Sequence, residues 1–535
     1  MTSVSDSVYS EFERRSGENL AYWCLQRHLE HGRGNAIALN ADGKDVSYAH
    51  LASCVRVFCS EVAIRNGDVV AILLPDSLSF ASCFLGIIAA GATAVPISTR
   101  LASADLTEVL LRIRPRFIVV DRTTSPMLSS VGLTSIGQVV VDNGWWTDAY
   151  NEQQASPLTM QGGGEDRAYC LMSSGSTGAP KLVLSRHSAP IECLRAFERG
   201  VVPFEADERV MSSARLTFGY GLLGNLLFSL LNGSTSLLRS IPFTPMDFMD
   251  SVAALGPSMI LSQPKFVRSM LARSVEPLRS ARVVLSAGEP LSASLLRDWE
   301  GALATPLLDA LGSTELGHIF IASSVGSAVP GKTGLLCPGY QAEVRDADGV
   351  DVGVGQIGEL YARGPAMTDG YLDDHNRTLE LRRVGWIRTG DMVSRDEKGY
   401  FQVHGRVDDL IKAGCGEWII PGEVEAVAME QGGLAECAVV AQQGPGGVSM
   451  IACFYVPSDT KLTHAAIEQH IQAAILARWP HEEFRSIDKF VVRRSLPRSA
   501  NGKVSRAALR ADLRAQLETI PQSKSAVLAV TTVMD

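Results

Sequence analysis

The sequence lacks the signatures that mark several function classes. Its ten cysteines form no CxxC pair and no cysteine–histidine cluster with zinc spacing, so neither a zinc site nor a disulfide framework is indicated, and free thiols in a reducing cytosol are expected. The 49 Lys and Arg residues are outnumbered by 58 Asp and Glu residues, which gives a net charge of -9. A general binder of nucleic acid needs clustered positive charge, so no nucleic-acid partner is expected.

Long uninterrupted apolar runs are also missing. Residues 80–97, FASCFLGIIAAGATAVPI, carry no charge, but Gly91 and Pro96 interrupt them. We therefore predict a buried helix over 77–90 and then a strand, ATAVPI, in place of a membrane span. The polar N-terminus, MTSVSDSVYSEFERRSGE, predicts no signal peptide. Together these features favour a cytoplasmic protein.

Length and pattern predict more than one domain. The 535 residues exceed a single core, since cores stop growing at about 250–300 residues. Short β-branched runs alternate with helical patterns, as in DVVAILLP (68–75) before the helix at 77–90 and ARVVLSAGEP (281–290) before the helix at 291–303. Such alternation is typical of α/β layers with a partly parallel sheet. Near residue 340 strand–turn–strand patterns, YQAEVRDADGVDV and GELYARG, replace it.

We predict an α/β fold in two parts. A large N-terminal domain over 1–405 would contain layered α/β subdomains and a β-barrel-like part. A small mobile C-terminal α/β domain over 406–520 would contain the strands ECAVVAQQ, SMIACFYVP and KFVVRR and a helix over 464–479. Residues 521–535 would form a flexible tail.

The stretch MSSGSTGAPKL (172–182) cannot bury much apolar area, because it consists mainly of Gly, Ser, Thr and Pro. Its glycines allow close approach of the backbone to a ligand, and its hydroxyls, N–H groups and Lys181 would make an anion cradle. A solvated surface loop is the alternative. The Walker A pattern does not fit the stretch.

Six further blocks follow this loop in order: SAGEP (286–290), LGSTELGHIF (311–320), GELYARGP (358–365), GWIRTGD (385–391), GRVDDLIK (405–412) and LPRSANGK (496–503). With the loop, they resemble the adenylate-forming (ANL) superfamily, which includes acyl- and aryl-CoA ligases, peptide-synthetase adenylation domains and beetle-type luciferases. FGYGLLGN (218–225) and STELGHIF (313–320) are most similar to benzoate-CoA-type aryl ligases. The resemblance implies two steps: ATP and a carboxylic acid give acyl-AMP and pyrophosphate, and a thiol then displaces AMP.

The resemblance also implies roles for residues in the nucleotide site. The β- and γ-phosphates would lie on the loop, at Ser173, Ser174, Gly175, Ser176, Thr177, Gly178 and Lys181. Adenine would lie beside Gly288, Glu289, Pro290, Asp309 and Gly312. In the block after Gly312, Ser313 would contact the nucleotide, Thr314 would bond the α-phosphate and Glu315 would hold Mg²⁺. Asp391 and Arg406 would bind the ribose, and Lys503 would reach the carboxylate and the α-phosphate.

The resemblance places other residues around the acid and the thiol. The acyl pocket would be lined by Gly219, Tyr220, Gly288, Gly312 and His318, the hinge would be Asp408, and the CoA path would pass Lys412, Gly414 and Gly416. Taken alone, His318 beside Ile319 and Phe320 also fits a core histidine. The loop KAGCGEWIIP (412–421) is one residue longer than the usual spacing, with Cys415 in the insertion. Leu182 and Ser499 also depart from the common pattern.

The leading hypothesis is an ATP-dependent, AMP-forming ligase that activates an aromatic or cyclic carboxylic acid and transfers it to CoA, with Mg²⁺. The alternatives are a stand-alone adenylation enzyme that loads a separate acyl-carrier protein, a non-catalytic nucleotide- or acyl-adenylate-binding protein, and a luciferase-like oxidase. The presence of Lys503, Glu315 and Asp391 together argues against a mere binder. A monomer or homodimer is expected.

Overall fold

The computed structural model describes residues 4–129, 132, 136–141, 158–173, 180–205, 207–241, 243–412, 418–431, 433–443, 449–458, 462–479, 486–498 and 504–518. Internal contacts divide the chain into two compact units. Unit 1 comprises Met1–Thr389 and Val393–Val403, and unit 2 comprises Gly390–Met392 and His404–Asp535. The predicted boundary at 405/406 stays a prediction, and this division also assigns two short segments before it, 390–392 and 404–405, to unit 2.

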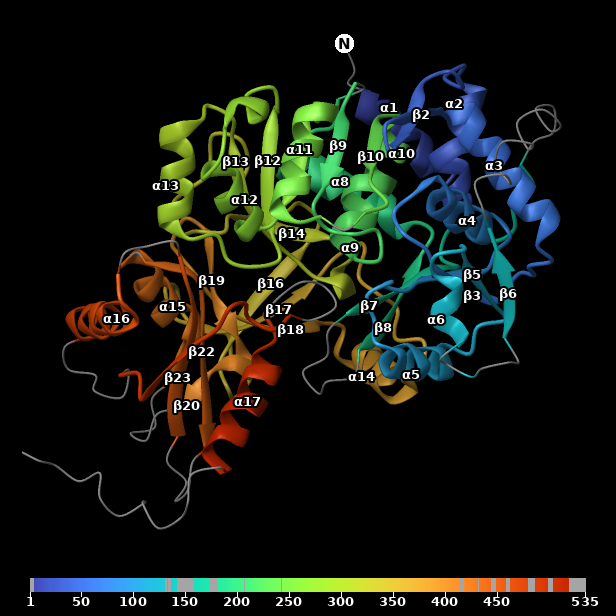
Figure 1. Ribbon diagram of the computed structural model, residues 1–535. Helices are drawn as coiled ribbons and strands as arrows, with labels where there is room; N and C mark the ends of the chain where they lie inside the picture. Colours follow the sequence, from blue (N-terminus) through green and yellow to red (C-terminus); the bar gives the residue numbers. More distant parts are fainter. Residues whose placement is uncertain are drawn as a thin grey trace, which may run out of the picture. The chain divides into compact units, whose positions relative to one another are not determined.

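A nine-stranded sheet is the largest element of unit 1 (Figure 1). Its strands, in spatial order, are β15 (Leu335–Leu336), β14 (Ile319–Ala322), β13 (Leu307–Gly312), β12 (Val283–Ala287), β11 (Met259–Ser262), β9 (Arg209–Ser212), β10 (Thr235–Leu238), β1 (Ile37–Ala41) and β2 (Lys44–Ser47). The strands from β13 to β1 run parallel, and antiparallel strands close both edges. The predicted partly parallel sheet is confirmed.

Alternate residues of these strands pack on opposite helical layers. Ile260 and Val284 belong to a core shared with α11 (Pro245–Leu255), α12 (Pro264–Leu271) and α13 (Ala293–Ala302). Leu261 and Leu285 belong to the main core, which includes α8 (Ala189–Gly200) and α10 (Phe228–Asn232). This period of two is expected for strands covered on both faces. The predicted site residues after β12 and β13 therefore follow strands that are packed on both faces.

A six-stranded sheet forms the second layered part of unit 1. Its order is β6 (Gly137–Val140), β5 (Phe117–Val120), β3 (Val69–Leu73), β4 (Thr93–Pro96), β7 (Arg167–Ser173) and β8 (Lys181–Arg186). Only the β7–β8 pair is antiparallel. Helices α5 (Ser103–Ile113) and α6 (Ser125–Ser129) pack on one face, whereas α3 (Tyr48–Glu61) and α4 (Leu78–Ala89) join the main core.

Helix α4 confirms the interpretation of the apolar run at 80–97. The Ser77 side chain caps the helix by accepting a hydrogen bond from the Phe80 N–H group. The helix ends at Ala89, Gly91 adopts a positive φ, and β4 follows. Among the described residues, no helix combines the length and the apolar character that a membrane crossing requires.

The expected barrel-like part is a four-stranded sheet of β16 (Gln341–Arg345), β17 (Gly358–Arg363), β18 (Ile387–Arg395) and β19 (Phe401–Arg406). The DADG turn after β16 is present, because the Asp346 N–H group bonds to the Val350 carbonyl. No closed barrel occurs in the part of the chain that the structure describes, since this sheet has an open strand order.

The remaining helices of unit 1 are short or peripheral. They are α1 (Val4–Arg14), η1 (Tyr22–Gln26), α2 (Arg27–Glu30), α9 (Gly219–Gly221), η2 (Leu222–Leu227), η3 (Glu276–Leu278), η4 (Thr314–Leu316) and α14 (His375–Val384). Of these, η1 and η2 are π-helical turns, which often lie near functional sites.

Unit 2 is built around a three-stranded sheet of β22 (Leu434–Gln443), β23 (Ser449–Pro457) and β24 (Lys489–Val492). Helices α15 (Pro421–Glu430) and α16 (His464–Arg478) pack on one face, and α17 (Arg506–Glu518) packs on the other. The unit also contains η5 (Val407–Asp409) and the strand pair β20 (Ile411–Lys412) and β21 (Trp418–Ile419). The predicted strand, strand, helix, strand order is confirmed.

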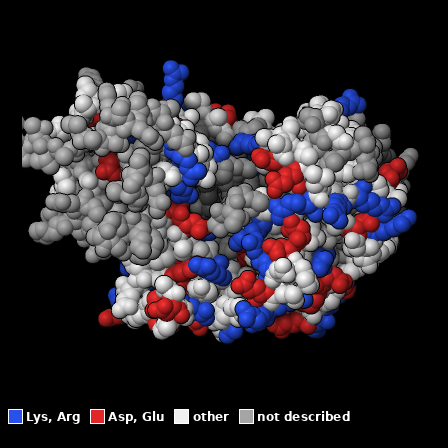
Figure 2. All heavy atoms as spheres, turned by 90° about the horizontal axis from the view of Figure 1, so that it is seen from below, with Lys and Arg blue, Asp and Glu red and all other residues white. Residues whose placement is uncertain are grey.

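The surface carries charges of both signs. Figure 2 shows basic and acidic side chains interspersed over the described part of the face seen from below. The nine described cysteines are all free thiols.

Candidate active site

The buried carboxylate of Glu315 brings several predicted phosphate and metal residues together. It lies on η4, directly after β13, and is 8% exposed. Lys181 Nζ is 3.3 Å from Glu315 Oε1, and Ser173 Oγ donates to the same oxygen at 3.4 Å. Ser313 Oγ donates to Glu315 Oε2 at 3.0 Å. Three segments of the sequence therefore converge on one carboxylate.

The β7–β8 hairpin positions the first two of these donors. Ser173 is the last residue of β7, Lys181 is the first residue of β8, and the two are register partners. The loop tip with Ser174, Gly175, Ser176, Thr177 and Gly178 lies outside the described residues. The hairpin thus delivers both ends of the predicted anion cradle to Glu315.

The Glu315 carboxylate lies beside two serine hydroxyls. No group of three or more His, Cys, Asp or Glu side chains suited to a metal occurs among the residues that the structure describes. Mg²⁺ in nucleotide sites is commonly held by one or two carboxylates together with phosphate oxygens and water. A lone carboxylate flanked by two serine hydroxyls fits that requirement. Thr314, the neighbouring residue, is half-buried on the same turn.

The predicted adenine residues lie at the carboxyl ends of β12 and β13. Gly288 and Pro290 are exposed just after β12, and Glu289 between them is half-buried. Such strand ends are the general location of ligands in open α/β sheets. Asp309 pairs in register with Ser286 and accepts a hydrogen bond from the Ala310 N–H group at 3.0 Å.

Asp309 is 5% exposed, and burial raises its pKa to about 8, against the lowering effect of hydrogen bonds from Thr333 and main-chain groups. A carboxyl in this condition is largely protonated at neutral pH. It can therefore donate as well as accept a hydrogen bond. The sequence gives no sign of this state, because it depends on the helices that cover β13.

The predicted acyl-pocket residues Tyr220 and His318 lie in contact. Their rings are stacked, with centroids 5.7 Å apart and planes inclined by 24°. The Tyr220 hydroxyl donates to the Leu285 carbonyl at 3.1 Å, which fixes the ring against the end of β12. Gly219 is half-buried beside Tyr220. Gly312 lies close to the His318 main chain, because a Cβ atom there would be 2.9 Å from the His318 carbonyl oxygen.

The surroundings of His318 were missed by sequence reasoning. Phe228 and Phe197 meet its ring edge-on, at centroid distances of 4.8 and 6.0 Å. Gly224, within η2, lies so close that a Cβ atom would be 3.1 Å from His318 Nε2. Gly224 lies within the block FGYGLLGN (218–225) and Phe228 follows that block closely, so their place in the sequence is a usable signal; Phe197 lies on α8 and offers none.

Asp391 and Arg406, both predicted at the ribose, form an ion pair within unit 2. Arg406 Nη1 is 2.8 Å from Asp391 Oδ1. Asp391 is 8% exposed, whereas the Arg406 side chain is 45% exposed. The sheet neighbours β18 and β19 therefore bring the two predicted residues together.

The remaining predictions fall on unit 2. Asp408 is exposed on the single turn η5, and its neighbour Asp409 pairs with Arg510 and Arg506. Lys412 ends β20, and its side chain is not described. Gly414, Cys415, Gly416, Ser499 and Lys503 lie outside the described residues.

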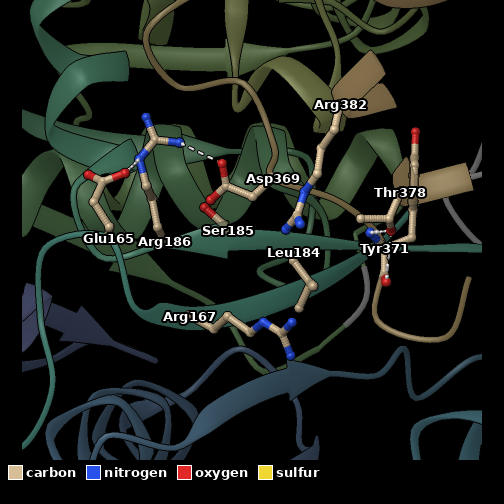
Figure 3. Close-up of a pocket in the computed structure, with 9 residues that line it drawn as sticks. All are labelled: Glu165, Arg167, Leu184, Ser185, Arg186, Asp369, Tyr371, Thr378 and Arg382. Carbon is tan, nitrogen blue, oxygen red and sulfur yellow. Dashed lines mark hydrogen bonds and ion pairs between the residues drawn. The ribbon is translucent and has the colours of Figure 1, made fainter. Parts of the chain in front are cut away.

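A separate polar cavity of about 200 Å³ lies beside β8 (Figure 3). It is lined by Glu165, Arg167, Leu184, Ser185, Arg186, Asp369, Tyr371, Thr378 and Arg382, none of which is a predicted site residue. Arg186 organises it by pairing with Glu165 at 3.0 Å and Asp369 at 3.8 Å. Arg186 also donates to the main-chain carbonyls of Met367 and Pro365. The contacts of Arg186 therefore explain the polar lining of this cavity.

Comparisons with known proteins agree with the motifs. Residues 25–372 match the model of the AMP-binding enzyme family, and residues 423–503 match that of the AMP-binding enzyme C-terminal domain. A 3-hydroxybenzoate–CoA ligase of Aromatoleum sp. (strain CIB) is 29% identical over 504 residues, which cover 91% of this chain and 95% of the relative. A benzoate–CoA ligase of Thauera aromatica is 28% identical over 510 residues, 92% of this chain and 95% of the relative.

Solved structures share the fold. The crystal structure of the anthranilate CoA ligase AuaEII in complex with anthranoyl-AMP is 26% identical, with a TM-score of 0.85 and coverage of 94% of this chain and 98% of that chain. The resemblance to the adenylate-forming superfamily is confirmed, and so is the α/β fold with a large and a smaller domain. The chain belongs to the AMP-binding enzyme family.

Proposed function

We propose that this protein is an ATP-dependent, AMP-forming ligase that activates an aromatic or cyclic carboxylic acid and transfers the acyl group to CoA. The observation that carries the proposal is the convergence of Lys181, Ser173 and Ser313 on the buried Glu315 carboxylate. The matching family and the aryl-CoA ligases among the relatives support it. The aromatic lining around Tyr220 and His318 suits a ring acid.

In the first step a carboxylate oxygen of the acid forms a bond to the α-phosphorus of ATP. The bond between the α-phosphorus and the bridging oxygen breaks, and pyrophosphate leaves. Lys181 and the loop around Ser173 would bind the β- and γ-phosphates, and Thr314 would bond the α-phosphate. Glu315 would hold Mg²⁺, which supplies positive charge where negative charge develops. Lys503 would stabilise the attacking carboxylate.

In the second step the CoA sulfur bonds to the acyl carbon, and the bond between that carbon and the phosphate oxygen breaks. AMP leaves, and the thiol proton is released. We propose that the small domain over 406–520 turns about Asp408 between the steps and brings Lys412, Gly414 and Gly416 to the CoA path, with 521–535 as a flexible tail. Hinges of this kind are a few residues that absorb the φ/ψ change.

The nucleotide would further contact Gly288, Glu289, Pro290, Asp309 and Gly312 through its base and Asp391 and Arg406 through its ribose. Ser313 would also contact the nucleotide. The acid would lie against Gly219, Tyr220, Gly288, Gly312 and His318. A neutral, donor-capable Asp309 suits an uncharged base better than a phosphate. A cytoplasmic location and a monomeric or homodimeric state are part of the proposal.

The test is mass spectrometry of products from the purified protein with ATP, Mg²⁺, CoA and a panel of acids: benzoate, hydroxybenzoates, anthranilate, larger polycyclic acids and fatty acids. A CoA thioester of a ring acid, absent with Lys503→Ala, is expected. Acyl-AMP that accumulates without thioester would instead indicate transfer to a separate acyl-carrier protein. No product from any ring acid would overturn the proposal.

A further inference from the structure

His318 is a buried polar side chain without a polar partner. It is 3% exposed, and neither Nδ1 nor Nε2 makes a hydrogen bond to any residue that the structure describes. Burial lowers its pKa to about 4, so the imidazole is neutral at neutral pH. A neutral imidazole has one N–H donor and one lone-pair acceptor. Leaving both unpaired in a buried position is unfavourable, and such groups call for a specific explanation.

The protein around His318 offers aromatic and aliphatic surface instead of partners. Tyr220 stacks on the ring, and Phe228 and Phe197 meet it edge-on. The Tyr220 hydroxyl is committed to the Leu285 carbonyl at 3.1 Å and does not serve the imidazole. These contacts therefore hold the imidazole ring in one orientation, but among the described residues they give its nitrogens no hydrogen-bond partner.

A neutral imidazole without partners lacks two different ones. Its N–H group lacks an acceptor, and the lone pair on its other nitrogen lacks a donor. The main chain of Tyr220 does not reach hydrogen-bond geometry with either nitrogen. A ligand that reaches the lone pair must therefore carry a hydrogen-bond donor.

We propose that His318 accepts a hydrogen bond from a hydroxyl or amino substituent on the ring of the acid, so that the enzyme selects donor-bearing aryl acids. The inference rests on the proposed function, which places His318 at the acid. A methyl or fluoro group of similar size has no proton to donate and would leave the lone pair unpaired. A site built around a substrate hydrogen bond rejects such analogues far more strongly than an apolar pocket does.

Gly224 acts as a positioning residue for this contact. It lies in the π-helical turn η2, and a Cβ atom there would be 2.7 Å from Leu261 Cδ1 and 3.1 Å from His318 Nε2. Only glycine lets the turn lie this close to the imidazole. At Gly219 a Cβ atom would find ordinary contacts of 3.6 and 3.7 Å. Gly224→Ala should therefore displace the ring, and Gly219→Ala should not.

The test measures kcat/KM for the 2-, 3- and 4-hydroxy- and aminobenzoates and for the matching methyl- and fluorobenzoates. The readout is the ratio for each donor-bearing acid over its methyl counterpart. In the unmodified enzyme we expect at least one ratio to exceed about ten. His318→Leu should reduce that ratio about ten-fold, His318→Gln should restore part of it through its amide oxygen, and Gly224→Ala should lower it.

A buried histidine elsewhere supplies the control. His187 is 1% exposed and accepts a hydrogen bond from the Leu20 N–H group at 3.1 Å. His187→Gln should keep the ratio of the unmodified enzyme. Thioester formation with ratios near one, or a high ratio that His318→Leu leaves intact, would overturn this inference alone. The absence of adenylate and thioester from every ring acid would overturn the proposed function.

Discussion

The ammonium nitrogen of Lys181 lies 3.3 Å from the Oε1 atom of Glu315, although 134 residues separate the two in sequence. Their side chains are 25% and 10% exposed, so the pair is partly shielded from solvent. The pair holds together a cation suited to phosphate and an anion suited to Mg²⁺. Binding of an ATP–Mg²⁺ complex at these residues would replace the contact between them with a contact from Lys181 to phosphate and a contact from Glu315 to Mg²⁺.

Glu315→Gln should abolish most of the activity without unfolding the protein. The amide has nearly the same size, and its oxygen can accept from one of the two serine hydroxyls while its NH2 group donates to the other, but it cannot hold Mg²⁺ as a carboxylate does. We expect kcat for acyl-AMP formation to fall about 10²–10³-fold. Pyrophosphate release at several Mg²⁺ concentrations measures it. Glu276→Gln, at an 80% exposed side chain paired with Arg279, is the matched control; equal activity in both variants would exclude Glu315 from the reaction.

Asp309 should make stability depend on pH in an unusual direction. Its folded pKa of about 8 lies above the ordinary carboxyl value of 3.8, because of burial. Between these values the folded state binds more protons than the unfolded state, so stability falls as pH rises, by up to about 1.4 kcal/mol per pH unit. Above pH 8 the effect levels off.

Asp309→Asn removes that contribution, so its free energy of unfolding should decline less steeply from pH 5 to 8 than that of the unmodified protein. Denaturant unfolding at several pH values tests this. Asp348→Asn, at an exposed carboxylate in the turn after β16, should follow the unmodified protein. Parallel curves for all three proteins would contradict a protonated Asp309.

Asp408→Pro should separate the two half-reactions. Asp408 is exposed on the single turn η5, and proline would fix its φ near -65° and restrict Val407 before it. We expect acyl-AMP to form and thioester formation to be lost. Asp408→Ala keeps the backbone free and should retain both steps. Normal thioester turnover in Asp408→Pro would contradict the hinge.

Arg186→Met should loosen residues 365–372, which include the segment that pairs with β8. Arg186 donates to the Met367 and Pro365 carbonyls, and the side chain is only 13% exposed. Its acidic partners Glu165 and Asp369 are 79% and 58% exposed, so those ion pairs contribute little. Leaving the carbonyls unpaired should cost about 1–3 kcal/mol.

Hydrogen exchange over 365–372 and thermal unfolding measure this loss. The control is Arg167→Gln, on the neighbouring strand at the same cavity and exposed to solvent (Figure 3). It should leave exchange over 365–372 unchanged. Arg186→Lys should not restore the segment, because an ammonium cannot reproduce the forked geometry of a guanidinium.

Local signals predicted most of the elements that carry the site. Ser77 and Gly91 bracket α4 as capping chemistry requires, and the β-branched run before SAGEP forms β12 as expected. The ordered motifs predicted that Ser173, Lys181 and Glu315 would act together, and these residues lie in contact. Each of these predictions depended on short stretches of sequence.

What the sequence could not supply depends on contacts between distant segments. The π-helical turn η2 and its approach to His318 come from packing of Gly224 against Leu261, which belongs to a strand 37 positions later in the chain. The pKa of Asp309 depends on the layers that bury β13. The open four-stranded sheet in place of a barrel-like part depends on strand order, which composition does not determine.

The ion pair between Asp391 and Arg406 limits how this enzyme can be recombined with its relatives. A crossover at the predicted boundary of 405/406 would take Asp391 from one parent and Arg406 from the other, although the two side chains meet at 2.8 Å. Both residues belong to unit 2, which contains Asp391 because it includes the short segment Gly390–Met392. With a crossover before residue 387, β18 and β19 would come from the same parent, and both residues of the ion pair would stay together.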